Sequence, residues 1–305
     1  MAPRRTFLTG ASGSVGSAVC SELVRRGEDV VCLVRKILPP VKGCRLFFGD
    51  LTDLRGAAVE IAQADEIIHC ASPRTDDRRR VLQEDIEGTA KLLDLWQRGP
   101  FIWTSSQTVY GIPTDVLRET APVNASGWYD LAKICNEQQV QMTAKTGRRG
   151  PGISLRLPLV FAAGPRRRDR QFLPQLYDAL HDGKVFLFSS EQGFETFGSV
   201  FIGEADLGRA LADARSIHES GPYNVASGFC TWRELLEELG RQCGHKPKFA
   251  VRANTSPGPG EFRLPQSRSY YDCTRFESAI GFRPAQSLTD VIGHFVRAER
   301  AISSQ

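Results

Sequence analysis

The sequence has little that would suit a membrane protein or an exported one. No window approaches the roughly 18 consecutive apolar residues of a membrane-spanning helix. Strand-forming residues follow the opening MAPRR almost at once, and no apolar stretch ends in a small-residue cleavage site, so we expect no secretion signal. A reducing, cytoplasmic compartment is therefore the expected location, and no membrane partner is expected.

Paired cysteine motifs are also missing. The eight cysteines include no C-x-x-C pair, and most stand in apolar stretches, where a cysteine is usually a small buried hydrophobe. We therefore expect no metal site.

Neither sign of charge dominates. Lys and Arg number 39 against 35 Asp and Glu, and apolar residues make up 41% of the chain, as in ordinary globular proteins. Short arginine runs at 78–80 and 166–168 are typical of solvated surfaces, so no nucleic-acid partner is expected. A length of 305 residues suits about two domains or one large α/β unit.

The first half of the chain alternates between apolar strands and segments with helical spacing. We expect strands at 5–9, 29–34, 45–48, 67–70, 101–104 and 153–157, and helices at 14–26, 81–97 and 128–145. The strands are apolar throughout rather than at every second residue, which is typical of a parallel sheet covered on both faces. With right-handed crossovers, the pattern predicts an α/β protein with a doubly wound parallel sheet, the Rossmann fold.

The pattern is less regular in the second half. Loops rich in glycine, proline and charge are expected at 162–170 and 252–268, helices at 171–181, 204–217 and 231–242, and short strands near 197–202 and 222–225. We expect residues 1–160 to form the sheet domain, with 197–225 returning to it. Residues 161–196 and 226–305 would form a smaller substrate lobe over the carboxyl ends of the strands.

A glycine-rich turn joins the first strand to the first helix. Gly10, Gly13 and Gly16 follow a G-x-x-G-x-x-G spacing, which permits a tight turn and a close approach of backbone amides to a pyrophosphate. The helix N-terminus adds partial positive charge. The strand–turn–helix context favours a dinucleotide site, with contacts also from Ser12, Ser14 and Val15.

The end of the second strand bears on the choice of cofactor. The position where a carboxylate would bind the ribose 2′-hydroxyl is Val34, followed by Arg35 and Lys36. A guanidinium can stack on adenine and bind a 2′-phosphate, so NADP(H) is favoured over NAD(H). The alternative is two solvated charges at the start of a loop.

Two further strand ends suit the cofactor. Asp50 and Leu51 follow the third strand, where the carboxylate can lie beside the adenine amino group or cap a helix that starts near Asp53. Small residues after the fourth strand would let the chain pass beside the cofactor: Cys70, Ala71 and Ser72. His69 is expected to be a packed, hydrogen-bonded histidine rather than a catalytic one.

Tyr129 and Lys133 are the candidate catalytic pair. Their spacing of four puts both side chains on one helix face. A phenol titrates near 10, and a neighbouring ammonium would stabilise its phenolate and could bind the nicotinamide ribose. Ser106, after the fifth strand, could then orient a substrate carbonyl while Tyr129 transfers the proton. Ser105 is the competing residue for that role.

Six motifs stand along the chain in this order: TGASGSVG, GDLTD, HCAS, TSSQTVYG, YDLAK and RLPLVFAAGP. In order and spacing they resemble the motifs of the extended short-chain dehydrogenases, the NAD-dependent epimerase/dehydratase family. The resemblance covers nearly the whole chain. The resemblance implies a Ser106–Tyr129–Lys133 triad and a homodimer formed in part by the helix that bears Tyr129. Arg35 is similar to the basic residue of NADP-using members. Pro158, Leu159 and Val160 fall where the family's chain passes the nicotinamide.

Departures from the family pattern narrow the reaction. Gln107 and Thr108 stand where dehydratases of the family carry Asp-Glu, so dehydration is not expected. The stretches 197–201 and 259–262 lack the arginines that hold a sugar-nucleotide diphosphate, which favours another substrate unless Arg263 or residues 166–170 substitute. Asp85 replaces the family's asparagine, which puts a local hydrogen-bond network in doubt. Gln107 and Thr108 are expected to contact substrate, and Arg74 either borders that pocket or is simply exposed.

Together these features predict an NADP(H)-dependent oxidoreductase that interconverts a ketone and a secondary alcohol on a polar small molecule, such as a keto-sugar or a natural-product intermediate. The runner-up is a sugar-nucleotide epimerase with tightly bound NAD. A dinucleotide-binding sensor without catalysis is the third hypothesis.

Overall fold

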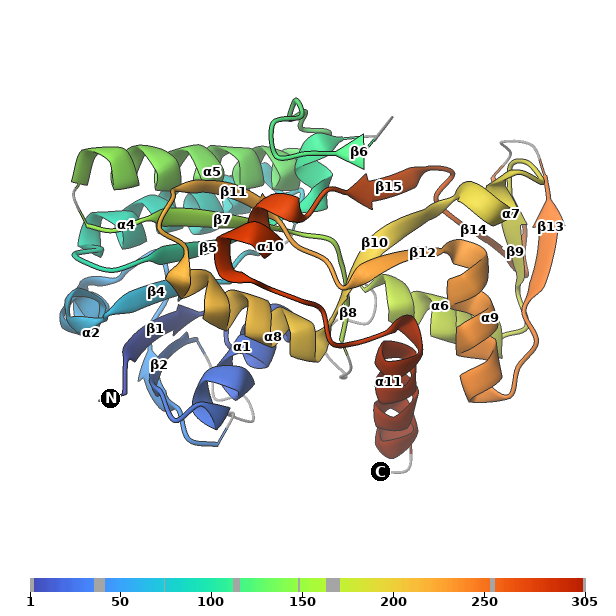
Figure 1. Cartoon of the computed structure of the whole chain (residues 1–305), viewed down its shortest axis with the longest axis horizontal. Coiled ribbons are helices and arrows are strands. Elements are labelled where there is room, and N and C mark those ends of the chain that lie inside the picture. Colours follow the sequence, from blue (N-terminus) through green and yellow to red (C-terminus); the bar gives the residue numbers. More distant parts are fainter. Residues whose placement is uncertain are drawn as a thin grey trace.

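Seven parallel strands form the main sheet of this computed structural model (Figure 1). The structure describes residues 3–35, 42–73, 75–111, 116–147, 149–162, 171–252 and 256–303. The strand order is β11-β7-β5-β4-β1-β2-β3. The strands are β1 (Arg5–Thr9), β2 (Asp29–Val34), β3 (Arg45–Phe48), β4 (Glu66–His69), β5 (Phe101–Ser106), β7 (Gly152–Leu157) and β11 (Gly221–Asn224). The expected doubly wound sheet is therefore confirmed.

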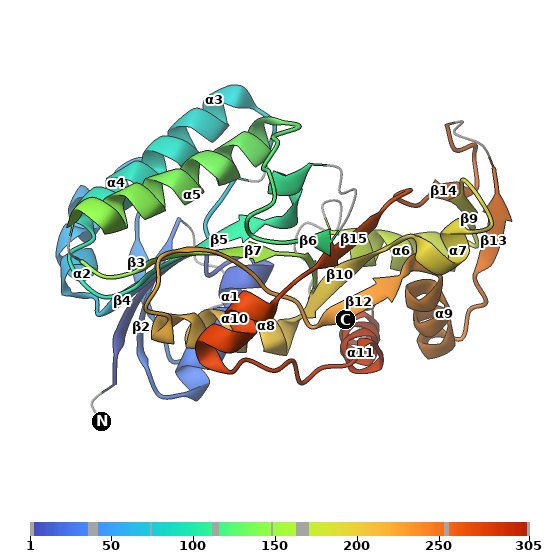
Figure 2. The same cartoon turned by 45° about the horizontal axis from the view of Figure 1, so that its top comes forward.

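Helices cover both faces of this sheet (Figure 2). One face carries α1 (Ser14–Arg25), α8 (Glu204–Asp213) and α10 (Thr274–Ile280), and the other carries α2 (Ala58–Gln63), α4 (Gly88–Leu95) and α5 (Trp128–Gly147). Fully buried strand residues such as Leu8 pack toward α1, whereas Phe7 packs on the opposite side with Trp96 and Trp103. Two covered faces explain why these strands are apolar throughout.

The helix expected over 81–97 begins earlier and changes its winding. It starts as α3 (Arg78–Arg80), continues as a π-helical segment at Val81–Glu87 and then becomes α4. The π-helical turn carries Asp85 to a position where it is 1% exposed. Such turns are frequent at functional sites, and this one lies beside the end of β4.

Two smaller sheets form the second lobe. One has the order β12-β10-β15-β6, with β8 paired to β10, and the other has the order β13-β9-β14. Their strands are β6 (Val116–Leu117), β8 (Leu159–Phe161), β9 (Val185–Phe188), β10 (Gly198–Gly203), β12 (Gly228–Thr231), β13 (Lys248–Val251), β14 (Glu261–Arg263) and β15 (Arg268–Tyr271). The helices are α6 (Phe172–His181), α7 (Gly193–Thr196), α9 (Trp232–Cys243) and α11 (Leu288–Ser303). An aromatic-rich core that includes Phe186, Phe188 and Phe295 holds them together.

Two segments differ from the expected division of the chain. Residues 197–203 do not return to the main sheet, because β10 pairs with β8, β12 and β15 of the smaller lobe. In contrast, α10 was expected in the lobe, yet its Phe276 is fully buried in the core of the main sheet. Among the described residues, no helix is both long and apolar enough to cross a membrane.

Candidate active site

The glycine turn lies at the carboxyl edge of the main sheet, where β1 stands between β2 and β4. Such a reversal of strand order is where open α/β sheets bind ligands. Gly10 has φ +75°, and a Cβ there would lie 2.6 Å from the backbone nitrogen of Ala71. A Cβ on Gly16 would lie 2.2 Å from the carbonyl oxygen of Gly10. The protein's own packing therefore requires both of these glycines.

Gly13 is different, because nothing in the described protein fills the space beside it. The nearest atom to a Cβ on Gly13 would be the Gly10 carbonyl oxygen at 3.5 Å, an ordinary contact. Gly13 is the N-cap of α1, where no described side chain caps the helix and the first turn holds no acidic residue. Free space and uncapped amides at a helix N-terminus suit a pyrophosphate. Ser14, at the start of α1, accepts a 2.8 Å hydrogen bond from Gln171, so residues beyond the sheet domain reach this turn.

This contrast predicts separate outcomes for two alanine substitutions. Gly13→Ala should leave the thermal unfolding temperature nearly unchanged but lower dinucleotide affinity, because its methyl group occupies the approach to the phosphates. Gly16→Ala should destabilise the fold by about 2 kcal/mol or more, because backbone must move. Calorimetric unfolding and a dinucleotide titration measure both effects. Unchanged dinucleotide affinity in Gly13→Ala would contradict the assignment of this turn.

Arg35 directly follows β2, and its side chain is 64% exposed. Its Nη1 lies 3.7 Å from Asp50 Oδ2 and 3.5 Å from Glu84 Oε2. The guanidinium is thus held loosely at the end of β2, where an adenosine ribose would lie. Lys36 lies outside the described residues.

Asp50 and Leu51 serve the fold in ways the sequence did not indicate. Asp50 accepts a 2.9 Å hydrogen bond from the Thr52 amide, while the helical turn beginning at Arg55 is served by Asp53, which accepts from the Arg55 amide at 3.1 Å. The suggestion that Asp50 caps this turn is therefore wrong, because its carboxylate accepts from the Thr52 amide, one turn earlier. Leu51 is 8% exposed and packs in the core beneath α4.

His69, at the end of β4, is fully buried and hydrogen-bonded at both ring nitrogens. Nδ1 lies 2.5 Å from Thr9 Oγ1, and Nε2 lies 3.0 Å from Thr89 Oγ1. Burial, aided by the charge of Lys133, lowers its pKa to about 3. The expectation of a packed, hydrogen-bonded histidine is confirmed.

The residues after His69 form the wall beside the turn. Burial raises the pKa of Cys70 to about 12. The amide of Ala71 donates to Thr9 Oγ1 at 3.2 Å, and the hydroxyl of Ser72 donates to Asp85 at 2.6 Å. The other carboxylate oxygen of Asp85 accepts from Asn136 Nδ2 at 2.8 Å. Asp85 thus maintains a local hydrogen-bond network despite its departure from the family pattern, and it ties the π-helical segment to α5.

Lys133 is the most constrained of the three candidate catalytic residues. The residue is 3% exposed, and its ammonium donates a hydrogen bond to the carbonyl oxygen of Thr104 at 2.9 Å. Nζ also lies 4.1 Å from the centre of the Trp103 ring and 5.4 Å from that of Tyr129. The spacing of four along α5 therefore places the ammonium on the same helix face as the Tyr129 ring, and the Thr104 carbonyl of β5 holds it there.

The structure separates Ser106 from its competitor. Ser105 is buried and donates to Glu137 Oε1 at 2.5 Å. Ser106 is half-buried, and its Oγ accepts from the amide and the hydroxyl of Thr108 at 3.3 and 3.1 Å. Both of these contacts leave the Ser106 proton for a substrate oxygen. Ser106 is therefore the better candidate.

Glu137 and Arg156 are residues that the sequence reasoning missed. Arg156 Nη2 lies 2.8 Å from Glu137 Oε2, and the two side chains are 4% and 2% exposed. Arg156 also donates to the hydroxyl of Tyr110 at 2.8 Å. The position of Glu137, one helical turn after Lys133, was the signal that could have indicated a role for it. Its partner Arg156 on β7 could not be inferred from spacing.

A cavity of about 160 Å³ opens beside Gln107 and Thr108, the two residues that follow Ser106. Its other lining residues include Leu159, Ser199, Trp232 and Ser269. Gln107 Oε1 accepts from the hydroxyls of Ser199 and Ser269 at 3.3 and 3.4 Å. No described lining residue is charged, so this wall suits hydroxyl groups and an apolar ring face. Arg74 lies outside the described residues.

The fold is that of an enzyme of the extended short-chain dehydrogenase type. The family model described as NAD dependent epimerase/dehydratase family matches residues 6–199, and the chain belongs to that family.

Individual relatives are distant. UDP-glucuronic acid decarboxylase 1 of Arabidopsis thaliana is 24% identical over 96% of this chain and 69% of its own. Cinnamoyl-CoA reductase 2 of the same plant is 28% identical over 77% and 76%. A sterol-4-alpha-carboxylate 3-dehydrogenase (decarboxylating) of Dictyostelium discoideum is 27% identical over 52% of this chain, which spans 54% of that relative. Among solved structures, a UDP-glucose-4-epimerase of Stenotrophomonas maltophila with bound NAD and formylated UDP-arabinopyranose has a TM-score of 0.84 at 21% identity, over 99% of both chains.

Proposed function

We propose that this protein interconverts a secondary alcohol and a ketone on a polar small molecule, by hydride transfer with a bound nicotinamide dinucleotide. The observation that carries the proposal is the position of Lys133 Nζ, fixed 2.9 Å from the Thr104 carbonyl oxygen and 5.4 Å from the Tyr129 ring centre. An ammonium held there would stabilise negative charge on the Tyr129 oxygen. Ser106 lies two residues after Thr104 on the same strand.

The bound nicotinamide would supply or accept the hydride. Tyr129 gives the proton to the carbonyl oxygen in the reducing direction and removes it from the alcohol in the other. Ser106 donates a hydrogen bond to the same oxygen, and Lys133 stabilises the phenolate. The uncapped amides at the start of α1 and the open space at Gly13 fit the pyrophosphate of the cofactor.

The relatives named for sugar nucleotides favour one form of this chemistry, in which NAD stays bound and the substrate is a sugar nucleotide. One Arabidopsis relative is a UDP-glucuronic acid decarboxylase, and the Stenotrophomonas structure holds NAD with a UDP-sugar. We therefore rank a sugar-nucleotide enzyme first, although the sequence alone ranked it second. An oxidised sugar intermediate would then be reduced again by the same cofactor, with no net consumption of it.

One observation favours the other form, a net reduction with NADP(H). The end of β2 carries Val34 and the exposed Arg35 instead of a carboxylate. Such an end removes the acceptor for a ribose 2′-hydroxyl and offers a cation for a 2′-phosphate.

The nucleotide that the purified protein carries discriminates between the two. Denaturation followed by mass spectrometry should release NAD from a sugar-nucleotide enzyme that retains its cofactor. Addition of UDP-glucose or UDP-glucuronic acid should then produce transient nicotinamide fluorescence without net cofactor turnover. Protein that purifies empty, binds NADPH and consumes it with a carbonyl substrate supports net reduction instead. Failure to bind either dinucleotide would contradict both forms.

Arg35 gives a direct test of the cofactor. Arg35→Asp should weaken NADPH binding by roughly ten- to a hundredfold while leaving NADH binding within a few-fold, because only the 2′-phosphate loses a charge-assisted contact. Arg79→Asp is the matched control, since Arg79 is an exposed arginine on α3 and the net charge changes equally. Isothermal titration measures the ratio of the two affinities. An unchanged ratio in Arg35→Asp would remove the case for NADP(H).

A further inference from the structure

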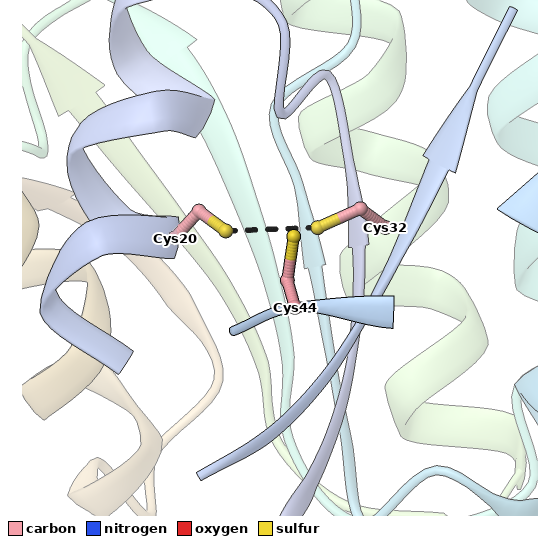
Figure 3. A group of neighbouring side chains, drawn as sticks. All are labelled: Cys20, Cys32 and Cys44. Carbon is pink, nitrogen blue, oxygen red and sulfur yellow. Dashed lines mark hydrogen bonds between the residues drawn. The ribbon is translucent and has the colours of Figure 1, made fainter. Parts of the chain in front are cut away.

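Three cysteine side chains from different elements point at one another beneath the first helix (Figure 3). Cys20 lies in α1 and Cys32 in β2, and Cys44 directly precedes β3. Their sulfur atoms all lie within 4.8 Å of one another, and the sulfurs of Cys20 and Cys32 are 3.6 Å apart. Cys20 and Cys32 are fully buried, whereas Cys44 is partly exposed and offers access from solvent. We refer to these residues as the thiol cluster.

The spacing of the sulfurs suits a shared central atom. Three sulfurs bound at about 2.3 Å to one centre lie roughly 3.5–4 Å apart, which matches the 3.6 Å contact. A disulfide needs about 2.05 Å between two sulfurs. The thiols also approach from three sides, as they would around an atom with three sulfur ligands.

The surroundings decide which kind of atom fits. The cluster lies in the apolar core with Leu8, Val19 and Leu23, and no fourth described His, Cys, Asp or Glu joins the group. A divalent cation with three thiolates would leave one negative charge in this core, and burying an uncompensated charge is costly. A trivalent centre with three thiolates is neutral and needs no fourth ligand.

We propose that the thiol cluster is a binding site for one trivalent, thiophilic metalloid, of which arsenite is the probe. Arsenous acid, As(OH)₃, exchanges its three hydroxyl groups for the thiolates of Cys20, Cys32 and Cys44. Three As–S bonds form, three As–O bonds break, and the three thiol protons leave with the hydroxides as three waters. Arsenic remains trivalent throughout, so no oxidant or reductant takes part.

Occupation of this site would join α1, β2 and β3 through one atom. The glycine turn precedes α1 and Arg35 follows β2, so the ligand would brace the elements that present both. The prediction is that arsenite raises the unfolding temperature of the full-length protein, since a ligand that binds only the folded state stabilises it.

Native mass spectrometry of the full-length protein tests the stoichiometry. The protein is kept reduced with a phosphine, because a dithiol reductant would compete for arsenic. The expected product contains one arsenic and has lost three hydrogens, which reports three As–S bonds. A product that retains one or two hydroxides on arsenic would overturn the three-thiol assignment.

Single variants locate the site. Cys44→Ala should weaken arsenite binding by roughly a hundredfold and abolish the three-hydrogen loss, because the third thiol is already held near the other two. Cys230→Ala is the matched control, since Cys230 is a buried cysteine of the other core and lies outside the thiol cluster. Circular dichroism verifies that both variants fold. Binding that survives Cys44→Ala unchanged, or that disappears in Cys230→Ala, would contradict the proposal.

A parallel titration with zinc tests whether the net charge of the complex decides which ion binds. Zn²⁺ prefers four ligands, and its three-thiolate complex would carry a negative charge, so we expect it to bind more weakly than arsenite and to raise the unfolding temperature less. Zinc that binds more tightly than arsenite, again dependent on Cys44, would refute the preference for a neutral trivalent centre.

Discussion

Tyr129→Phe is expected to lower the rate of hydride transfer by roughly a hundred- to ten-thousandfold, the usual contribution of a positioned general acid or base. The substitution removes only the hydroxyl, so the packing of the half-buried ring beside Lys133 is retained. Dinucleotide affinity should change little, because the glycine turn is untouched. The measurement is a single-turnover reaction of the bound nicotinamide, followed by its fluorescence, with the substrate found in the cofactor experiment.

Tyr270→Phe is the matched control for this loss. Tyr270 is 39% exposed on β15 and contacts Phe229. The same hydroxyl deletion there should leave the rate within a few-fold of the parent. A Tyr129→Phe protein that also stays within a few-fold would remove the proton-transfer role, even if dinucleotide binding is intact.

The local parts of the site could be predicted from the sequence because each depends on short spacing. The glycine turn needs only a strand, three glycines and a helix in order, and the approach of Lys133 to Tyr129 needs only one helical turn. The choice between Ser105 and Ser106 was harder. Neighbouring residues of a strand face opposite sides, so the choice depends on which side meets α5, and the structure shows that Ser105 contacts Glu137 there.

Features built from distant segments could not be predicted in the same way. The strand at 198–203 was expected at nearly the right residues, but a short apolar run does not say which sheet it joins, and it pairs with β12 and β8. Successive cysteines of the thiol cluster are twelve residues apart along the chain, and the three meet only because α1 packs over β2 and β3. The sequence predicted that most cysteines stand in apolar stretches, but their convergence has no local signal.

Breaking the buried pair of Arg156 and Glu137 should produce the largest loss of stability in the molecule. Burial acts to lower the pKa of Arg156, but the hydrogen bond and charge of Glu137 outweigh it, so the pKa is raised and Arg156 keeps its charge. Arg156→Met leaves the Glu137 carboxylate 2% exposed, and the Ser105 hydroxyl is then its one remaining donor among the described residues. Removing one member of such a pair costs about 3–5 kcal/mol. Urea unfolding measures this as a lower midpoint at unchanged slope.

The double variant Glu137→Leu with Arg156→Met separates the cost of an unpaired charge from the worth of the pair. Two apolar side chains of similar volume often replace a buried ion pair at little cost, so the double variant should recover most of the stability that Arg156→Met loses. Its activity should nevertheless fall, because Ser105 loses the acceptor that fixes the end of β5 beside Ser106. Ser105→Ala removes that one hydrogen bond while keeping the ion pair, so it should share the loss of activity but only about 1 kcal/mol of the loss in stability. Full activity in the double variant would mean that the pair serves the fold alone and does not position the catalytic serine.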